Sequence, residues 1–390
     1  MFTTPPQIGK LSRRALLLGG AGTALAACQV GLPVGGGAPG PRVAAGTVNA
    51  ALLVPYSSTA AGDDLVARSL EQAARLAARD IADVTVGISV YPTAGTPAGA
   101  ASAAEQAVRE GADIIAGPLR SDAAAAASVA ARGRLNVLSF SNNTEIAGGN
   151  VFVLGNTFAN TAFRLVNYAA SQGRNRFVIL HAQTLAGEIA RDAVLEALPF
   201  AGASLVGAIP YEFSANGVVD ALPGVIETIR DGGANALFIT SDTTGALPLF
   251  AQLLPENGLD TSQVQVMGMT RWDTPPQTLE LSGLQGGWFA LPDPAATARF
   301  QSAYTAAWGE PPHVLGGLGY DAVQLIAAAA RTSGQLGARD LVSASAVQGA
   351  GGVFRANANG TTTRALAVAE VIDSQVSIRD PAAGLSGPGL

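Results

Sequence analysis

The stretch that decides the fold is GADIIAGPLRS, residues 111–121. Gly111 is well suited to end a preceding helix, and the apolar run 113–116 has the length of a short buried strand. A Gly-Pro pair closes that strand, and Ser121 is a residue type that caps the start of a helix. A strand placed directly between two helices is the repeating unit of a parallel sheet that is covered on both faces.

The same alternation continues in both directions along the chain. Short apolar or β-branched runs predict strands over 49–54, 84–91, 113–116, 136–140, 177–181, 204–209, 236–240 and 264–267. Apolar residues at helical spacing predict helices over 65–80, 96–110, 121–132, 160–171, 188–198, 218–231 and 245–254. These units divide about evenly around Gly155, so the sequence predicts an α/β protein with two doubly wound parallel sheets.

The last part of the chain departs from the regular alternation of strand and helix. It predicts a strand over 286–290, followed by helices over 295–308, 315–333 and 338–345. Strands over 353–356 and 363–372 flank Asn359-Gly360, which is a strong signal for a β-hairpin. Helix-rich sequence that follows two complete sheets is expected to return and cover the first of them.

Composition excludes several classes of protein. Hydrophobic residues make up 48% of the chain and charged residues 13%, which rules out wholesale disorder. A net charge of −6 argues against a broad nucleic-acid-binding surface, because phosphate contacts need clustered Lys and Arg. One Cys and two His allow neither a disulfide framework nor a multi-His metal site. Without a nucleophile elbow or a phosphate-binding Lys loop, the sequence predicts no enzyme, no cofactor and no metal.

The beginning of the chain predicts an export signal over residues 1–27. Basic residues precede an apolar run over 15–27, which is too short to cross a membrane but suits a signal peptide. Ser12-Arg13-Arg14 resembles the start of a twin-arginine signal, with general secretion as the alternative.

A lipid anchor is expected directly after this signal. Leu25-Ala26-Ala27-Cys28 resembles a bacterial lipobox, which implies lipidation of Cys28, and a coincidental Cys after a plain signal peptide is the alternative. Residues 28–46 are rich in Gly and Pro and predict a flexible tether. Gln29 follows the lipidation position, and the absence of Asp there favours anchoring to the outer membrane.

Polar loops follow the first, third and fourth predicted strands, at residues 55–59, 117–121 and 139–144. Open parallel sheets bind ligands at the carboxyl ends of their strands, so these loops are expected to line a binding cleft. Tyr56 and Ser57 lie in the first loop and are candidate binding residues. The alternative is that these residues form ordinary caps and turns, which use the same residue types.

Several segments together resemble the leucine/isoleucine/valine-binding protein family, whose members are type I periplasmic binding proteins. These segments are residues 51–55, 111–118, 136–142, 319–323 and 351–355, with Gly360. The resemblance covers about residues 47–372 and implies two doubly wound parallel-sheet lobes joined by three crossovers. It implies crossovers near Gly155, Ala290 and Gly351, with lobe 1 over 47–155 and 291–350 and lobe 2 over 156–290 and 351–380.

The resemblance also implies a site in the first lobe. In relatives that bind amino acids, a Ser at a helix start and groups in the next loop hold the ligand carboxylate. The matching positions in this chain are Ser121, Ser141 and Asn143. The implied function is capture of a small amino-acid-like or peptide-like solute in the periplasm for an ABC transporter.

The second lobe of such relatives offers an aromatic residue and an acid to the ligand ammonium group. The position of the aromatic residue falls at Thr243 or Thr244, and the position of the acid falls at about Thr270. Neither residue type is retained here, and Asp242 or Asp273 is the candidate substitute for the missing acid. A buried ammonium group without an acidic partner loses a charge-assisted contact of about 1.5–3 kcal/mol.

A second family resemblance is confined to residues 268–273 and 287–294. These residues are similar to the C-terminal domain of the penicillin-binding protein activator family. Members of that family are outer-membrane lipoproteins with the same two-lobed fold, and they act by contacting peptidoglycan synthases. The sequence therefore favours two functions, which are solute binding for a transporter and regulation of cell-wall synthesis by protein contact, with a cryptic enzyme as the third alternative.

Overall fold

The structure is a computed structural model that describes residues 46–382 and 384–385. The predicted signal peptide, Cys28 and all of the predicted tether except Gly46 lie outside the described residues. In the part of the chain that the structure describes, no helix is both long enough and apolar enough to cross a membrane.

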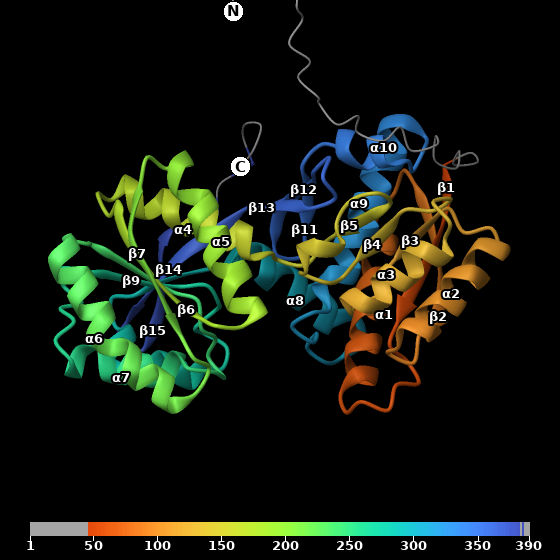
Figure 1. The fold of residues 1–390 in the computed structure, drawn as a ribbon. Coiled ribbons are helices and arrows are strands. Elements are labelled where there is room, and N and C mark those ends of the chain that lie inside the picture. The colour runs from red at the N-terminus through yellow and green to blue at the C-terminus, as the bar shows by residue number, and fades with distance from the viewer. Residues whose placement is uncertain (1–45, 383, 386–390) are drawn as a thin grey trace, which may run out of the picture. The chain divides into compact units, whose positions relative to one another are not determined.

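The first sheet has five parallel strands in the order β2-β1-β3-β4-β5 (Figure 1). Its strands are β1 (Thr47–Val54), β2 (Thr85–Pro92), β3 (Ile114–Ala116), β4 (Val137–Ser139) and β5 (Val151–Val153). The strands β3, β4 and β5 are buried at every residue, as expected for parallel strands with helices on both faces. The sequence predicts the first four strands, and β5 is an additional one.

The second sheet has seven strands in the order β15-β14-β10-β9-β8-β6-β7. Its strands are β6 (Arg176–Ala182), β7 (Ser204–Tyr211), β8 (Ala236–Ile239), β9 (Gln265–Gly268), β10 (Trp288–Pro292), β14 (Leu366–Ile372) and β15 (Gln375–Asp380). The neighbouring strands β7, β6, β8, β9 and β10 pair in parallel in that order. At the other side of the sheet, β14 and β15 add an antiparallel edge. The predicted fold class, α/β with two parallel-sheet lobes, is confirmed.

Helices cover both faces of each sheet (Figure 1). On the first sheet, α1 and α9 pack on one face and α2 and α3 on the other. On the second sheet, α4 and α5 pack on one face and α6 and α7 on the other. The helices are α1 (Asp63–Asp80), α2 (Pro97–Arg109), α3 (Ser121–Ala130), α4 (Phe158–Ser171), α5 (Leu185–Phe200), α6 (Ala215–Gly232), α7 (Leu247–Glu256), α8 (Pro294–Trp308), α9 (Gly317–Ser333) and α10 (Ala338–Ser343).

Four helices begin at a hydroxyl cap. The side chains of Thr96, Thr157, Thr184 and Ser214 each accept a hydrogen bond from the backbone N–H three residues later. Each cap satisfies one of the N–H groups that a helix start leaves without an intrahelical partner, which typically contributes about 1 kcal/mol. The starts of α2, α4, α5 and α6 are thus fixed by local sequence.

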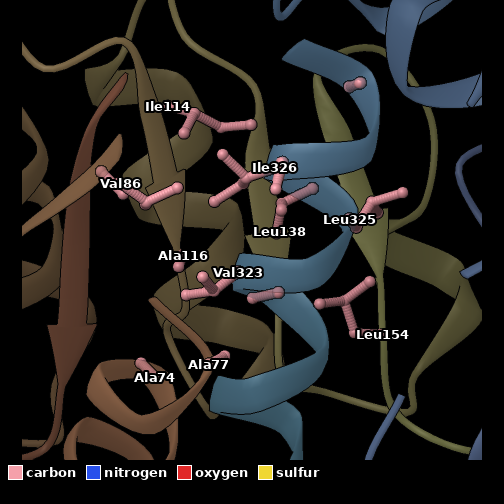
Figure 2. Close-up of a cluster of buried hydrophobic side chains, with 14 of the residues drawn as sticks. Ala74, Ala77, Val86, Ile114, Ala116, Leu138, Leu154, Val323, Leu325 and Ile326 are labelled. Carbon is pink, nitrogen blue, oxygen red and sulfur yellow. The ribbon is translucent and has the colours of Figure 1, made fainter. Parts of the chain in front are cut away.

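The late helix α9 returns to the first sheet. Figure 2 shows its Val323 and Ile326 within the same buried cluster as Ile114, Ala116 and Leu138 of the sheet. The helix can approach α1 closely because Gly319 has no side chain. A Cβ atom at position 319 would lie 2.2 Å from the carbonyl oxygen of Leu70.

The segment after α10 forms a small third sheet before it reaches the second lobe. This sheet consists of β11 (Val347–Gly349), β12 (Gly352–Ala356) and β13 (Thr362–Arg364). The hairpin predicted around Asn359-Gly360 joins β12 to β13, but the single strand predicted over 363–372 is divided into β13 and β14.

The third crossover lies in this segment. Phe354 and Ala356 belong to the core of the first lobe, whereas Leu366 belongs to the core of the second. We therefore propose that the chain passes between the lobes after Ala356 and before Leu366, later than the position near Gly351 that the resemblance implies.

Candidate functional site

A cavity of about 730 Å³ lies at the carboxyl ends of β3, β4 and β5. The cleft is also lined by α9 and the segment before it, by β12, and by residues after β9 and on β10, β13 and β14, so both large sheets contribute to it. This is the place where open parallel sheets bind ligands. Its polar and charged lining residues are Arg120, Ser121, Asp122, Ser141, Asn142, Asn156, Arg271, Asp321 and Arg364. We refer to this cavity as the cleft.

Ser121 and Ser141 are the predicted site residues that line the cleft. Ser121 is the first residue of α3 and does not cap it, so that part of the prediction is wrong. The capping position falls on Arg120, whose side chain makes no cap hydrogen bond. N–H groups in the first turn of α3 therefore lack a side-chain cap beside the cleft, although Asp122 accepts the N–H of Ala123.

Three other first-lobe candidates do not line the cleft. The Tyr56 hydroxyl donates to the Glu71 carboxylate at 2.9 Å, and burial is the main cause that raises the pKa of Tyr56. Ser57 is exposed and has a positive φ of 63° in the turn after β1. The Asn143 side chain accepts the N–H of Glu145 and caps a short 3-10 helix. The contacts of Tyr56 and Asn143 stabilise local structure.

The second-lobe candidates lie in the loops after β8 and β9. The Thr243 hydroxyl donates to the carbonyl of Thr274 at 3.1 Å. The Thr270 hydroxyl is buried without a hydrogen-bond partner among the described residues. Asp273 is paired with Arg271, and Arg271 is the member of that pair that lines the cleft. Asp242 is the other acid near this position, and its side chain accepts hydrogen bonds from the backbone N–H and the hydroxyl of Thr244.

A buried ion pair forms part of the cleft wall. Arg364 on β13 and Asp321 on α9 are 2.7 Å apart, and their side chains are 9% and 3% exposed. Arg364 also donates from Nε to the carbonyl of Leu154 at 3.0 Å, and Asp321 accepts the N–H of Ala350 at 2.7 Å. The pair therefore links β13, α9 and the segment that follows β5.

His181 shows what burial does to a titratable group elsewhere in the second lobe. It lies at the end of β6 and is 2% exposed, and its Nδ1 has no hydrogen-bond partner among the described residues. Burial lowers the pKa of His181, and nearby Glu188 and Asp192 oppose this shift while Arg191 adds to it. Burial thus favours the neutral imidazole, although Glu188 Oε1 lies 3.4 Å from its Nδ1.

We expect stability to fall as the pH is lowered from about 7.5 to about 5. In the unfolded chain His181 takes up a proton near its ordinary pKa of about 6.5, whereas in the folded protein it does so only at lower pH. The dependence of the melting temperature on pH should be weaker in His181→Gln than in the wild type. His313→Gln is the control, because that imidazole lies in a loop rather than on a buried strand. An unchanged slope in His181→Gln would contradict the prediction.

A second, larger cavity of about 940 Å³ lies beside α4, α5 and the β12–β13 turn. Its polar side chains mostly bind one another or the backbone. Asn357 binds Thr361 and Thr363, and Asn160 binds the backbone of Thr362 and Arg364. These groups are already satisfied, so the cleft is the better candidate for a ligand site.

Solved structures with the same fold are bacterial binding proteins. A substrate-binding protein from Desulfitobacterium hafniense in complex with Leu has a TM-score of 0.62 and 20% identity, covering 85% of this chain and 99% of its own. One from Sphaerobacter thermophilus has a TM-score of 0.65 and 16% identity, covering 87% and 99%. One from Rhodopseudomonas palustris in complex with 3,4-dihydroxy benzoic acid has a TM-score of 0.56 and 19% identity, covering 86% and 98%.

A family model identifies the chain more directly than these structures. No curated protein matches the chain significantly. The model described as periplasmic binding protein matches residues 47–375, which is most of the chain. This agrees with the predicted family and with the expectation of a binding protein rather than an enzyme. The chain therefore belongs to the periplasmic binding protein family.

Proposed function

We propose that the protein captures a small organic solute in the cleft and delivers it to an ABC transporter. The observation that carries this proposal is the position of the cleft, which lies at the carboxyl ends of first-lobe strands and takes wall residues from both lobes. Domain closure around such a cleft is a general way to trap a ligand. The complexes with Leu and with an aromatic acid in proteins of the same fold support this role.

The lining suits a ligand with an anionic group and an apolar body. The first turn of α3 offers N–H groups and the Ser121 hydroxyl, which favour an anion. Apolar side chains cover much of the remaining wall, as is usual for small-molecule sites. They are Leu119, Phe140, Val314, Leu315, Leu318, Val353 and Leu366.

A thermal-shift screen of the purified full-length protein tests this proposal. The screen should contain amino acids, aromatic acids, short peptides and muropeptides. A ligand at about 100 times its Kd stabilises a protein by about 2.7 kcal/mol, which gives a clear rise in melting temperature. We expect at least one small organic acid or amino acid to produce such a rise. The absence of any rise across the screen would contradict the proposal.

Lipid anchoring in the periplasm is a further part of the proposal. It is supported by the sequence around Cys28 and by the family match. Replacing Cys28 by Ser removes the thiol that lipidation requires, so we expect Cys28→Ser to move the protein from the membrane fraction to the soluble periplasmic fraction. Continued membrane association of this variant would refute the anchor.

Activation of a peptidoglycan synthase is the alternative function. The residues that carry that resemblance include Trp272 and Trp288, which are 0% and 7% exposed and belong to the core of the second lobe. Buried residues do not form a contact surface, so solute binding is the better-supported function. Co-purification of a peptidoglycan synthase, together with a failed ligand screen, would favour the alternative.

A further inference from the structure

The second lobe presents a cation to the cleft. Arg271 follows the carboxyl end of β9 and lines the cleft, with its side chain 36% exposed. Asp273 holds it in a two-point contact, with Nε 2.9 Å from Oδ1 and Nη2 2.5 Å from Oδ2. The third nitrogen of the guanidinium group, Nη1, has no partner among the described residues. Arg271 is therefore fixed in position and still has N–H groups to offer.

Asp273 is not available to a ligand ammonium group. Both of its carboxylate oxygens are bound by Arg271, its side chain is 19% exposed, and it does not line the cleft. An ammonium group placed at this wall would meet the guanidinium group first, and like charges repel.

The other charged residues of the cleft differ in what they can offer. Asp321 has one oxygen bound by Arg364 and the other by the backbone of Ala350. Arg120 is directed to Asp63, since its Nη2 donates to both Asp63 oxygens at 2.9 Å. Asp122 is exposed at the start of α3 and is the one lining carboxylate, among the described residues, that a ligand ammonium group can reach.

We propose that Arg271 determines specificity and that the ligand is an organic acid without an amino group, whose anionic group lies between Arg271 and the first turn of α3. This inference rests on the proposed solute-binding function and names its ligand class. Arginine suits the role because its planar N–H groups match a carboxylate and its charge persists at every physiological pH. The apolar body of the acid then lies against Phe140, Leu315 and Leu318.

Matched ligands separate the acid from the amino acid. Leucine, isocaproate and isocaproamide share one carbon skeleton, as do benzoate and benzamide, and their affinities can be measured by calorimetry on the full-length protein. A charge-assisted hydrogen bond to an ionised group changes affinity by about tenfold to a hundredfold. We expect isocaproate or benzoate to bind at least about tenfold more tightly than its amide, and isocaproate to bind more tightly than leucine.

Variants assign the effect to Arg271. Arg271→Gln should weaken binding of the acid by about tenfold or more and leave the amide unchanged, and Arg271→Lys should retain part of the affinity because it keeps the charge. Arg331→Gln is the matched control, because Arg331 is a partly exposed arginine paired with Asp83 and does not line the cleft. Circular dichroism of each variant checks that the fold is retained.

Two results would overturn the inference while the solute-binding function stands. One is tighter binding of leucine than of isocaproate. The other is binding that Asp122→Asn weakens and Arg271→Gln does not. Failure of these ligands and of the whole screen to bind would instead overturn the solute-binding function, and the inference would fall with it.

Discussion

Arg364→Met is expected to lower the free energy of unfolding by about 3–5 kcal/mol, because it leaves the buried carboxylate of Asp321 without its partner. The loss extends beyond the ion pair. The carbonyl of Leu154 loses its contact with the guanidinium group, and the cation over the ring of Phe354 is removed. Met keeps much of the length of the arginine stem, so the change tests the charge and the hydrogen bonds rather than an empty cavity.

Chemical denaturation of the variant and of a matched control measures this effect. The pair between Arg331 and Asp83 has side chains that are 40% and 59% exposed, so Arg331→Met should cost at most about 1 kcal/mol. Adding Asp321→Leu to Arg364→Met should recover part of the loss, because the second change removes the unpaired charge. An Arg364→Met variant no less stable than the Arg331→Met control would show that the buried pair contributes no more to stability than the exposed one.

Much of the fold follows from patterns that are local in sequence. Helices such as α1 and α6 have long apolar stripes, and the short apolar runs between helices have few alternatives to a buried parallel strand. The strand β5 is as short as β3 and β4, but it follows a 3-10 helix over Thr144–Ile146 rather than an α-helix, so the alternation of strand and helix does not indicate it. The division of 363–372 was missed because both of its parts are strand-like, and only their partners in different sheets separate β13 from β14.

The candidate site could be predicted only where it depends on strand ends. Ser121 and Ser141 lie in the segments that follow β3 and β4, so the rule for open parallel sheets places them at the cleft. Arg364 was not found, because its partner Asp321 lies 43 residues away and no local pattern joins them.

The charge that the second-lobe wall presents to the cleft is not evident from the sequence either. Asp273 is an acid that the sequence offers to an ammonium group, yet Arg271 stands two residues before it and binds both of its oxygens. The signal was present as an Arg and an Asp separated by one residue just after a strand end. What the sequence does not show is which of the two faces the cleft, since that depends on how the neighbouring Trp272 is buried.

Trp272→Ala is expected to destabilise the protein by about 3–5 kcal/mol, as is typical for removal of a large buried aromatic side chain. Trp272 is fully buried and packs against Phe289, with ring centroids 5.7 Å apart. Trp308→Ala is the matched control, because that ring is only partly buried and lies under Arg79, so its removal should cost less. Equal losses in the two variants, measured by chemical denaturation, would contradict the prediction.

Gly268 leaves room for the packed ring of Trp272, and this gives a second test. A Cβ atom at Gly268 would lie 2.3 Å from the indole nitrogen, so Gly268→Ala should destabilise the wild type by overpacking. In a Trp272→Ala background the added methyl group has room, and the same change should cost about 0.5–3 kcal/mol less than in the wild type. Strictly additive effects would show that the two positions do not share this space.

Because Trp272 lies between Arg271 and Asp273, its burial anchors the loop that presents the guanidinium group. Trp272→Ala should therefore also weaken binding of isocaproate or benzoate, whereas Trp308→Ala should not.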